Sequence, residues 1–471
     1  MFLFNRNLIY LAIAATLSGC VSMAKGMTEG TLPSDDHISL YCKIDNKKET
    51  KKITDSLNID VHIDGSGSML GYIKQDNSSY IKTLKLLDST LGLGGKRSQT
   101  TVKYHRSGDR KHQAKELTRS EFRKASKAEF YNGVNSIFPA VSSDLASIVN
   151  QPKKSGNLTV IVTDLDQNDG DINLIANKIK AAYFNQKDED YAVGVWGVKS
   201  EFNGTVYSAS DASKEFQYTT VGKSNSQYRP FYVLFLGHYQ DIADYFDKLQ
   251  KEQNFGDYAT AYPSDRSKFL IFSPEHFLND VSYLSTPVNL SSDLATPSTL
   301  HNGDVAVEKN NQPIELLEIK DKNADSLEAK HQVNLNKSSH TLSVDPDDIK
   351  TQINVTAFDK FSKKEFKPVP DAQKAINIDN WNLDGDKLEF TTSINPGNLN
   401  DSNIYYFKID AIAQDLQQPD WWKEWNLNSG NDGSKTSNLS GFMNSLKNIT
   451  LNSMDESTLI VGRFCYAVQK D

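Results

Sequence analysis

Apolar and polar residues in the first half of the chain follow patterns that predict strands and helices in turn. Residues 59–63 show the period-two alternation of a half-buried strand, and residues 158–162 are almost continuously apolar, as in a strand buried on both faces of a parallel sheet. Helical spacing follows the first of these strands, at Ile81, Leu84, Leu87 and Leu91. Each predicted strand therefore precedes a predicted helix or a new loop.

The same alternation continues to about residue 275. Further strands are predicted at 101–104, 191–196 and 231–236, and further helices at 172–183 and 240–249. Residues 105–139 are polar with weak periodicity, so we interpret them as an insertion. Strands alternating with helices are typical of a doubly wound, mostly parallel α/β sheet, which we expect over residues 51–275.

The pattern changes after residue 275. Short alternating strands are predicted at 331–335, 353–358, 388–394 and 404–411, separated by clusters of Asn, Asp, Gly and Pro, with one late helix near 439–446. We therefore expect residues 276–471 to form a β-rich, sandwich-like C-terminal unit. Its most distinctive residues are Trp421, Trp422 and Trp425, which would stack on sugars or a protein if exposed and form the core of this unit if buried.

The N-terminus predicts export. Its apolar run, residues 8–17, is shorter than the roughly 20 residues that a spanning helix needs, so residues 1–19 are expected to be a signal peptide. It ends in Leu17-Ser18-Gly19-Cys20, which resembles the bacterial lipobox. That resemblance implies acylation of Cys20 and a cell-envelope protein held by a lipid anchor. Val21 in place of Asp favours the outer membrane, and residues 20–50 would form the lipidated tether and first strand.

Two cysteines remain in the mature chain. Cys42 and Cys465 both lie in strand-like surroundings, and an even pair in an oxidising compartment favours a disulfide. The alternative is two buried, unpaired cysteines. A disulfide would join the two ends of the mature chain.

Composition limits the classes of partner. The chain has 471 residues, 38% hydrophobic and 24% charged, which is an ordinary globular composition with room for two or three domains. The formal net charge of -8 argues against nucleic acid, because phosphate binding needs a dense basic surface.

One acidic loop carries the candidate chemistry. Asp64-Gly65-Ser66-Gly67-Ser68 directly follows the predicted strand at residues 59–63. Alternate positions of a tight loop can point a carboxylate and two hydroxyls at one place. Oxygen ligands of this kind suit hard cations such as Mg²⁺, Ca²⁺ or Mn²⁺. Zinc prefers nitrogen and sulfur, and the sequence shows no cluster of His and Cys for it.

This Asp-x-Ser-x-Ser loop after a first strand resembles the metal-ion-dependent adhesion site of von Willebrand factor A domains. The resemblance covers about 190 residues and implies a second aspartate after a later strand, which Asp164 matches, although Leu165 replaces the family's usual glycine. It also implies a threonine from another loop, and Ser143 in Ser143-Asp144-Leu145, opening a helix, is the best match, with Ser142 as its nearest substitute.

That resemblance implies a binding protein, not an enzyme. Asp64, Ser66, Ser68, Ser143 and Asp164 would hold the divalent cation, and an open coordination position would accept a carboxylate from a protein partner.

Three other interpretations remain open. Residues 160–166 also resemble the first motif of haloacid dehalogenase-type phosphatases, with Asp164 as nucleophile and Asp166 as acid-base group, although Asn168 departs from that motif. A metal-dependent phosphatase-like hydrolase would then use the same acidic loop. Alternatively, Asp64 and Ser66 form only a turn and helix cap, or the domain is degenerate and structural, without metal.

Overall fold

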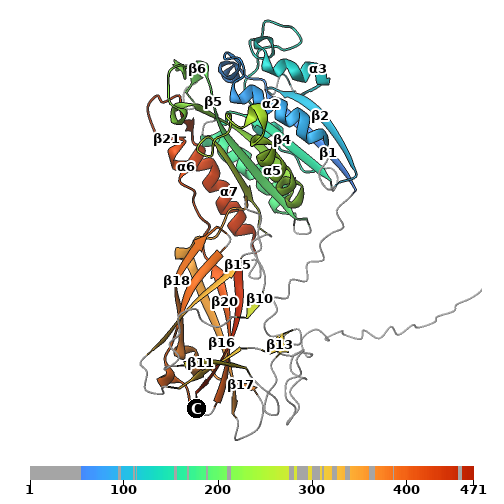
Figure 1. Ribbon diagram of the computed structural model, residues 1–471. Coiled ribbons are helices and arrows are strands. Elements are labelled where there is room, and N and C mark those ends of the chain that lie inside the picture. The colour runs from blue at the N-terminus through green and yellow to red at the C-terminus, as the bar shows by residue number, and fades with distance from the viewer. Residues whose placement is uncertain are drawn as a thin grey trace, which may run out of the picture.

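The computed structural model has an α/β upper part, built on the strands of residues 56–272, and a β-rich lower part, built on the strands of residues 281–413 and 460–470 (Figure 1). The structure describes residues 55–470, except 94–96, 110–111, 113, 153–155, 167–168, 187–188, 209–213, 275–280, 284–294, 300–307, 310–311, 314, 321–325, 335–339, 360–365, 386, 402 and 455–458. The predicted signal peptide, Cys20, the tether and Cys42 lie outside the described residues. Among the described residues, no helix is both long enough and apolar enough to cross a bilayer.

The upper part is built on a seven-stranded sheet of order β3-β2-β1-β4-β8-β5-β9. β2, β1 and β4 are parallel, and every other neighbouring pair in this sheet is antiparallel. The strands are β1 (Ser56–Asp64), β2 (Gln99–Ser107), β3 (Lys115–Leu117), β4 (Asn157–Thr163), β5 (Tyr191–Ser200), β8 (Arg229–His238) and β9 (Ser267–Phe272).

The predicted α/β class is therefore confirmed, but the sheet is mixed and its parallel pairs are confined to β2-β1-β4. The reason is the connection after β5. There the chain forms a hairpin, β6 (Asn203–Tyr207) and β7 (Glu215–Thr219), and β8 then enters between β4 and β5 in the antiparallel direction. The chain therefore re-enters the sheet at the end at which β5 left it, and β8 runs antiparallel to β5.

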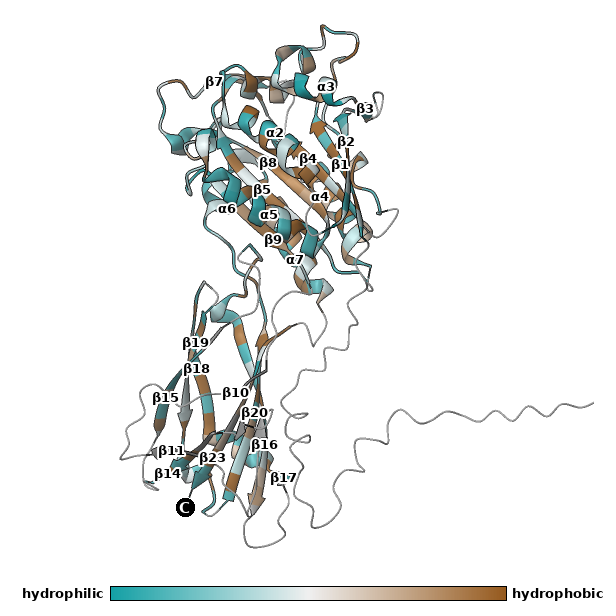
Figure 2. Cartoon of the chain, turned by 45° about the vertical axis from the view of Figure 1, so that its right-hand side comes forward, coloured by the Kyte–Doolittle hydropathy of each residue, from teal (hydrophilic) through white to brown (hydrophobic). Residues whose placement is uncertain are grey.

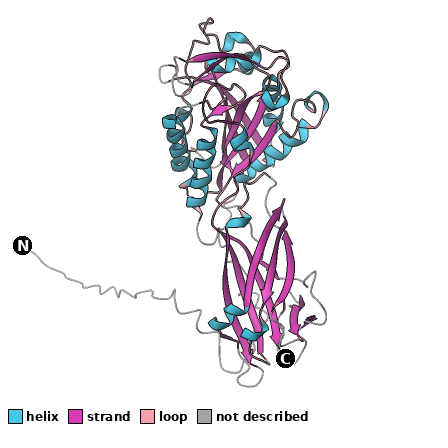
Figure 3. Cartoon of the chain, turned by 90° about the vertical axis from the view of Figure 1, so that its left-hand side faces the viewer, coloured by secondary structure: helices cyan, strands magenta, loops and turns pink. Residues whose placement is uncertain are grey.

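Helices cover both faces of the sheet (Figure 3). The apolar residues of β1 pack with α2 (Ser79–Thr90) and α5 (Tyr239–Gln253) in one core cluster. On the opposite face, apolar residues of β5 and β8 pack with α4 (Asp169–Ile179) and α7 (Leu439–Ser453). Figure 2 shows the strands between these layers as strongly hydrophobic.

The C-terminal segment 421–453 returns to the upper part of the molecule. α7 contacts α4 and β9, and α6 (Trp421–Glu424) lies beside it (Figure 1). Trp422 is fully buried, with its ring centroid 5.9 Å from that of Phe272 in β9. The expectation that everything after residue 276 belongs to the β-rich unit is therefore corrected. The tryptophans are buried, as one interpretation predicted, but against the α/β sheet.

The lower part contains two packed sheets, so the predicted β-rich unit is present. The larger has the order β11-β14-β23-β20-β16-β17, with β10 also paired to β23, and the smaller has the order β15-β19-β18. Phe390 of the smaller sheet lies 4.9 Å, between ring centroids, from Phe464 of the larger. The strands are β10 (Val281–Tyr283), β11 (Ala295–Thr299), β14 (Glu315–Ile319), β15 (Leu327–Asn334), β16 (Ile349–Asp359), β17 (Phe366–Pro368), β18 (Ile376–Asp384), β19 (Lys387–Ile394), β20 (Asn403–Ala413) and β23 (Ile460–Lys470).

One cysteine of the predicted pair is described. Cys465 lies buried in β23 and is disulfide-bonded. Its pairing with Cys42 stays a prediction, because Cys42 lies outside the described residues.

The segment predicted as an insertion is folded against β2. It contains β3, α3 (Arg119–Phe122) and two short 3-10 turns, η3 (Arg123–Ser126) and η4 (Ala128–Phe130). It buries a set of aromatic residues: Phe122, Phe130, Tyr131 and Phe138. Its weak periodicity follows from the shortness of these elements, since one helical turn is too brief to show an amphipathic pattern.

Candidate metal centre

The candidate site lies at the carboxyl ends of two neighbouring parallel strands. β1 ends at Asp64 and β4 ends at Thr163, and their register pairs Ile63 with Val162. Asp64 therefore lies beside Thr163, and Asp164 follows by one residue. Loops at the carboxyl ends of strands are the usual location of sites in open α/β sheets.

Asp64 is the point at which three segments meet. Its Oδ1 accepts a hydrogen bond from the Ser66 amide at 3.0 Å. Its Oδ2 accepts hydrogen bonds from the Ser143 and Thr163 hydroxyls, each at 2.9 Å. Asp64 is 1% exposed, so these contacts compensate for the loss of water around a buried carboxylate.

The serine hydroxyls of the loop also lie together. Ser66 Oγ and Ser68 Oγ are 3.0 Å apart at the start of η1 (Gly67–Ile73), a 3-10 helix that the Ser66 carbonyl begins by accepting a hydrogen bond from Met69 N. Two hydroxyls at this separation can face one ligand. The structure therefore brings four predicted residues, Asp64, Ser66, Ser68 and Ser143, into one hydrogen-bonded group.

Ser143 and its neighbour Ser142 point to different partners. The Ser142 hydroxyl donates to Asp109 at 3.4 Å, away from Asp64. The geometry thus favours Ser143, the first choice from the sequence. The helix predicted to start there is only a 3-10 turn, η5 (Leu145–Ser147), which Asp144 caps by accepting a hydrogen bond from the Ser147 amide.

Asp164 lies beside this group and is also buried, with 2% exposure. Its Oδ1 accepts from the Asp166 amide at 3.4 Å, while its Oδ2 is buried without a hydrogen-bond partner among the described residues. Leu165, which replaces the family's glycine, adopts a positive φ of 53°. The backbone therefore takes the left-handed conformation that glycine would favour, at some conformational cost.

Sequence reasoning missed the charged partner of Asp164 and Asp166. Arg229, at the start of β8, is 1% exposed, and its Nη2 lies 2.8 Å from Asp166 Oδ2 and 3.6 Å from Asp164 Oδ2. Its Nη1 donates to the carbonyls of Gly433 and Lys435, in the segment before α7. The only signal in the sequence was a lone arginine at the edge of an apolar strand.

Electrostatics shift the protonation of Asp164. Burial raises the pKa of the Asp164 carboxyl to about 6. The positive charge of Arg229 opposes this shift, and the negative charges of Asp166 and Asp64 add to it. Asp64 and Asp164 are therefore close enough to interact through their charges.

These residues fit a hard cation. The donor set consists of oxygen atoms alone, from Asp64, Ser66, Ser68, Ser143 and Asp164, and Thr163 adds a further hydroxyl that the sequence did not single out. Among the described residues, Asp164 Oδ2 is a buried acceptor without a hydrogen-bond donor, with Arg229 Nη2 3.6 Å away, and a cation would satisfy it. In the part of the chain that the structure describes, no three His, Cys, Asp or Glu side chains gather as a metal site, so the hydroxyls would have to contribute ligands.

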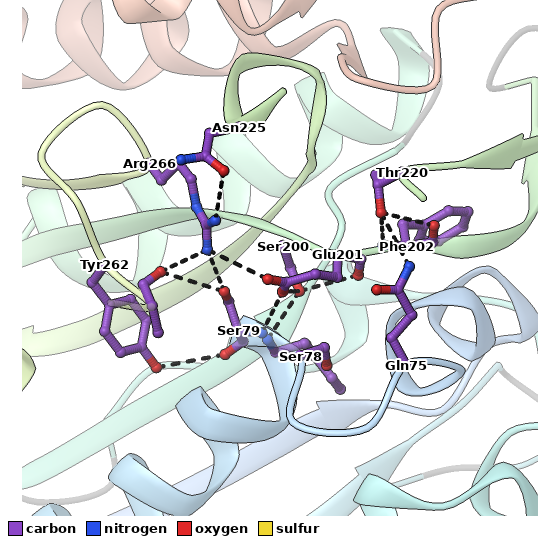
Figure 4. Close-up of polar contacts among 12 residues, drawn as sticks. Gln75, Ser78, Ser79, Ser200, Glu201, Phe202, Thr220, Asn225, Tyr262 and Arg266 are labelled. Carbon is purple, nitrogen blue, oxygen red and sulfur yellow. Dashed lines mark hydrogen bonds and ion pairs between the residues drawn. The ribbon is translucent and has the colours of Figure 1, made fainter. Parts of the chain in front are cut away.

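A second polar network supports the start of α2, which follows the acidic loop (Figure 4). Glu201 accepts a hydrogen bond from the Ser79 amide at 2.7 Å, and Arg266 Nη2 donates to Ser79 Oγ at 2.6 Å. Arg266 also lies 3.8 Å from Glu201. These contacts fix the N-terminus of α2 to the end of β5.

Comparison with known proteins gives no family for this chain: no family model matches it, and a search of curated proteins finds no significant match.

The shifted pKa predicts a pH dependence. Because the folded-state pKa of Asp164 lies above its ordinary value of 3.8, this group stabilises the metal-free fold below about pH 4, and the contribution is lost as pH rises to about 6. A divalent cation would displace this proton. We expect its apparent affinity to fall roughly tenfold for each pH unit below 6.

Calorimetric titration of Mg²⁺ at pH 5, 6 and 7 measures this dependence. The Asp164→Asn variant is the control, and it should bind weakly at every pH with a flat profile. A wild-type affinity that stays constant from pH 5 to pH 7 would show that Asp164 does not share its proton site with the cation.

Proposed function

We propose that this chain is an envelope-anchored binding protein whose upper part is a von Willebrand factor A-like domain with a divalent-cation adhesion site. The observation that carries the proposal is the convergence on Asp64 Oδ2 of hydroxyls from two other segments, Ser143 and Thr163, at 2.9 Å each. A turn or helix cap requires only local contacts. Ser143 and Thr163 lie 79 and 99 positions from Asp64 in the sequence, so a local turn or cap does not account for their contacts, and these contacts support a shared ligand site.

The fold is compatible with this assignment. The parallel β2-β1-β4 group, helices on both faces and a loop at the carboxyl end of β1 support it. The antiparallel β8 departs from a doubly wound parallel sheet, but it lies on the far side of β4 from the acidic loop.

In the proposed mechanism Ser66, Ser68 and Ser143 supply hydroxyl oxygens, and Asp64 and Asp164 supply charge. When bound, the cation provides a positive centre that attracts a carboxylate of a protein partner. Burial of Asp64 and Asp164 holds their carboxylates in a region of low dielectric, where their interaction with a cation is stronger than in water. Arg229 balances part of their negative charge from the side of β8.

Titration of Mg²⁺, Ca²⁺ and Mn²⁺ into residues 21–471 tests the proposal. We expect saturable binding of at least one of the three ions. Ser143→Ala should weaken it by about tenfold, as loss of a ligand or its immediate support does, and Ser142→Ala should leave it unchanged. Absence of binding of all three ions to the wild type would contradict the proposal.

The lipid anchor is a separate part of the proposal, based on Leu17-Ser18-Gly19-Cys20. Several acyl chains on one residue give durable anchoring, at about 0.8 kcal/mol for each buried methylene. Cys20→Ser should move the protein from the membrane fraction to the soluble fraction, as fractionation and immunoblotting would detect. Retention of the variant in membranes would contradict the anchor, without bearing on the metal site.

A further inference from the structure

A buried arginine connects the acidic loop to the inserted segment. Arg106, near the end of β2, is 5% exposed. Its Nη2 donates to the carbonyl of Gly65 at 2.9 Å and to that of Pro139 at 2.8 Å, and its Nε donates to the carbonyl of Phe130 at 3.0 Å. One guanidinium thus joins the loop after β1 to two points of the segment that follows β2.

The shapes of the loop and the arginine depend on each other. A Cβ at Gly65 would lie 2.7 Å from Arg106 Nε, 2.8 Å from Arg106 Cζ and 2.9 Å from the Ser107 carbonyl. Only glycine fits this close approach. The rings of Phe130 and Phe138 lie 5.4 Å and 5.9 Å from the guanidinium carbon, which is within the range of cation–π contact.

The two linked segments carry different members of the candidate site. Gly65 lies between Asp64 and Ser66, and Pro139 lies four residues before Ser143, whose hydroxyl donates to Asp64. Movement of one segment relative to the other would separate Ser143 from Asp64. Arg106 fixes the two segments at carbonyls one residue from Asp64 and four residues from Ser143 in the sequence.

We infer that Arg106 is a positioning residue of the metal centre, which holds the Asp64 loop and the Ser143 segment in the relative position that lets their oxygens share one cation. This inference rests on the proposed function. The positive charge of Arg106 is itself unfavourable to a nearby cation, so its contribution must come from geometry. The planar guanidinium, with several donors in fixed directions, can reach three carbonyls, and the single ammonium of lysine cannot match that arrangement.

Two variants separate geometry from charge. Arg106→Lys keeps the charge, and Arg106→Met removes it. We expect both variants to bind Mn²⁺ at least about tenfold more weakly than the wild type in calorimetric titration, which is the usual effect of losing the support behind metal ligands. If Arg106 acted through charge alone, Arg106→Lys would bind like the wild type and Arg106→Met would bind more tightly; unchanged or tighter binding by either variant would overturn the inference.

The control is another buried arginine at the opposite end of the same strand. Arg97 precedes β2, and its Nη2 forms an ion pair with Asp241. Arg97→Met should lower thermal stability and leave the Mn²⁺ affinity unchanged, so a general loss of stability is distinguished from a displaced site. If Arg106→Met does not fold, the Mn²⁺ affinity of Arg106→Lys tests the inference. A wild type that binds no Mn²⁺, Mg²⁺ or Ca²⁺ refutes the proposed function, whereas normal binding by a folded Arg106→Lys refutes only this inference.

Discussion

Asp64→Asn is expected to abolish the stabilisation of the protein by divalent cations. In the wild type, Mg²⁺ at about 100 times its dissociation constant should stabilise the fold by about 2.7 kcal/mol. In the variant we expect almost none of this stabilisation. Changing a residue that only supports a metal ligand weakens metal binding by up to about 100-fold, and loss of a charged ligand should weaken it at least as much.

The substitution is chosen to preserve the structure. Asn has the shape of Asp, and its amide oxygen can still accept hydrogen bonds from Ser143 and Thr163, which both donate to Asp64 Oδ2 in the wild type; only the bond from the Ser66 amide to Oδ1 is lost. The variant should therefore fold in the presence of a chelator. The measurement is thermal unfolding with Mg²⁺ and with a chelator, for wild type and variant.

Asp60→Asn is the matched control. Asp60 lies on the same strand, four residues earlier, and its Oδ1 contacts His105 at 3.1 Å. This variant loses a carboxylate in β1 but none of the candidate ligands, so its response to Mg²⁺ should equal that of the wild type. If Asp64→Asn responds to Mg²⁺ as fully as Asp60→Asn, the assignment of Asp64 fails.

Arg229→Met is expected to cause a large loss of stability. Arg229 is fully buried and pairs with Asp166 at 2.8 Å, with Asp164 close by. Removing one partner of a buried pair leaves uncompensated charge and typically costs about 3–5 kcal/mol. Methionine also leaves the carbonyls of Gly433 and Lys435 without this donor, so the segment before α7 should loosen.

Urea denaturation in the presence of a chelator measures this effect. Fluorescence reports mainly on the upper part, because four of the five tryptophans pack in or against it: Trp196, Trp421, Trp422 and Trp425. The loss should be smaller at pH 5 than at pH 7, since protonation of Asp164, whose pKa is raised to about 6, removes one unpaired charge.

Arg229→Lys serves as the control for charge. It keeps a positive charge near Asp166 but cannot donate in the two directions of Arg229 Nη1 and Nη2. We therefore expect a loss of stability smaller than that of Arg229→Met. Arg229→Met with stability within about 1 kcal/mol of the wild type would show that the acidic loop does not depend on this buried charge.

The sequence predicted the elements better than their connections. Periodicity located β1, α2, β4 and α5, because each has one or two buried faces and the apolar positions record them. It did not record the direction of β8, since a strand buried on both faces has the same apolar run whether its neighbours are parallel or antiparallel. Nor did it reveal that α7 packs on α4, because an apolar helix face does not specify which surface covers it.

The same limit applies to the candidate site. Asp64, Ser66, Ser68 and Ser143 were predicted from a loop pattern and a resemblance, and the structure places them together. Thr163 and Arg229 were not, because their roles arise only when β4 pairs with β1 and β8 pairs with β4. The antiparallel entry of β8 is what brings Arg229 to Asp164, so the missed strand direction and the missed ion pair have one cause.

The most direct test is a crystal structure of the protein grown with Mn²⁺, in which anomalous diffraction locates the ion. We expect one strong peak within about 2.6 Å of the hydroxyl oxygens of Ser66 and Ser68, with the carboxylates of Asp64 and Asp164 facing it directly or through water. A peak elsewhere, or an ordered loop with these two carboxylates turned away from each other and no ion between them, would contradict the central claim.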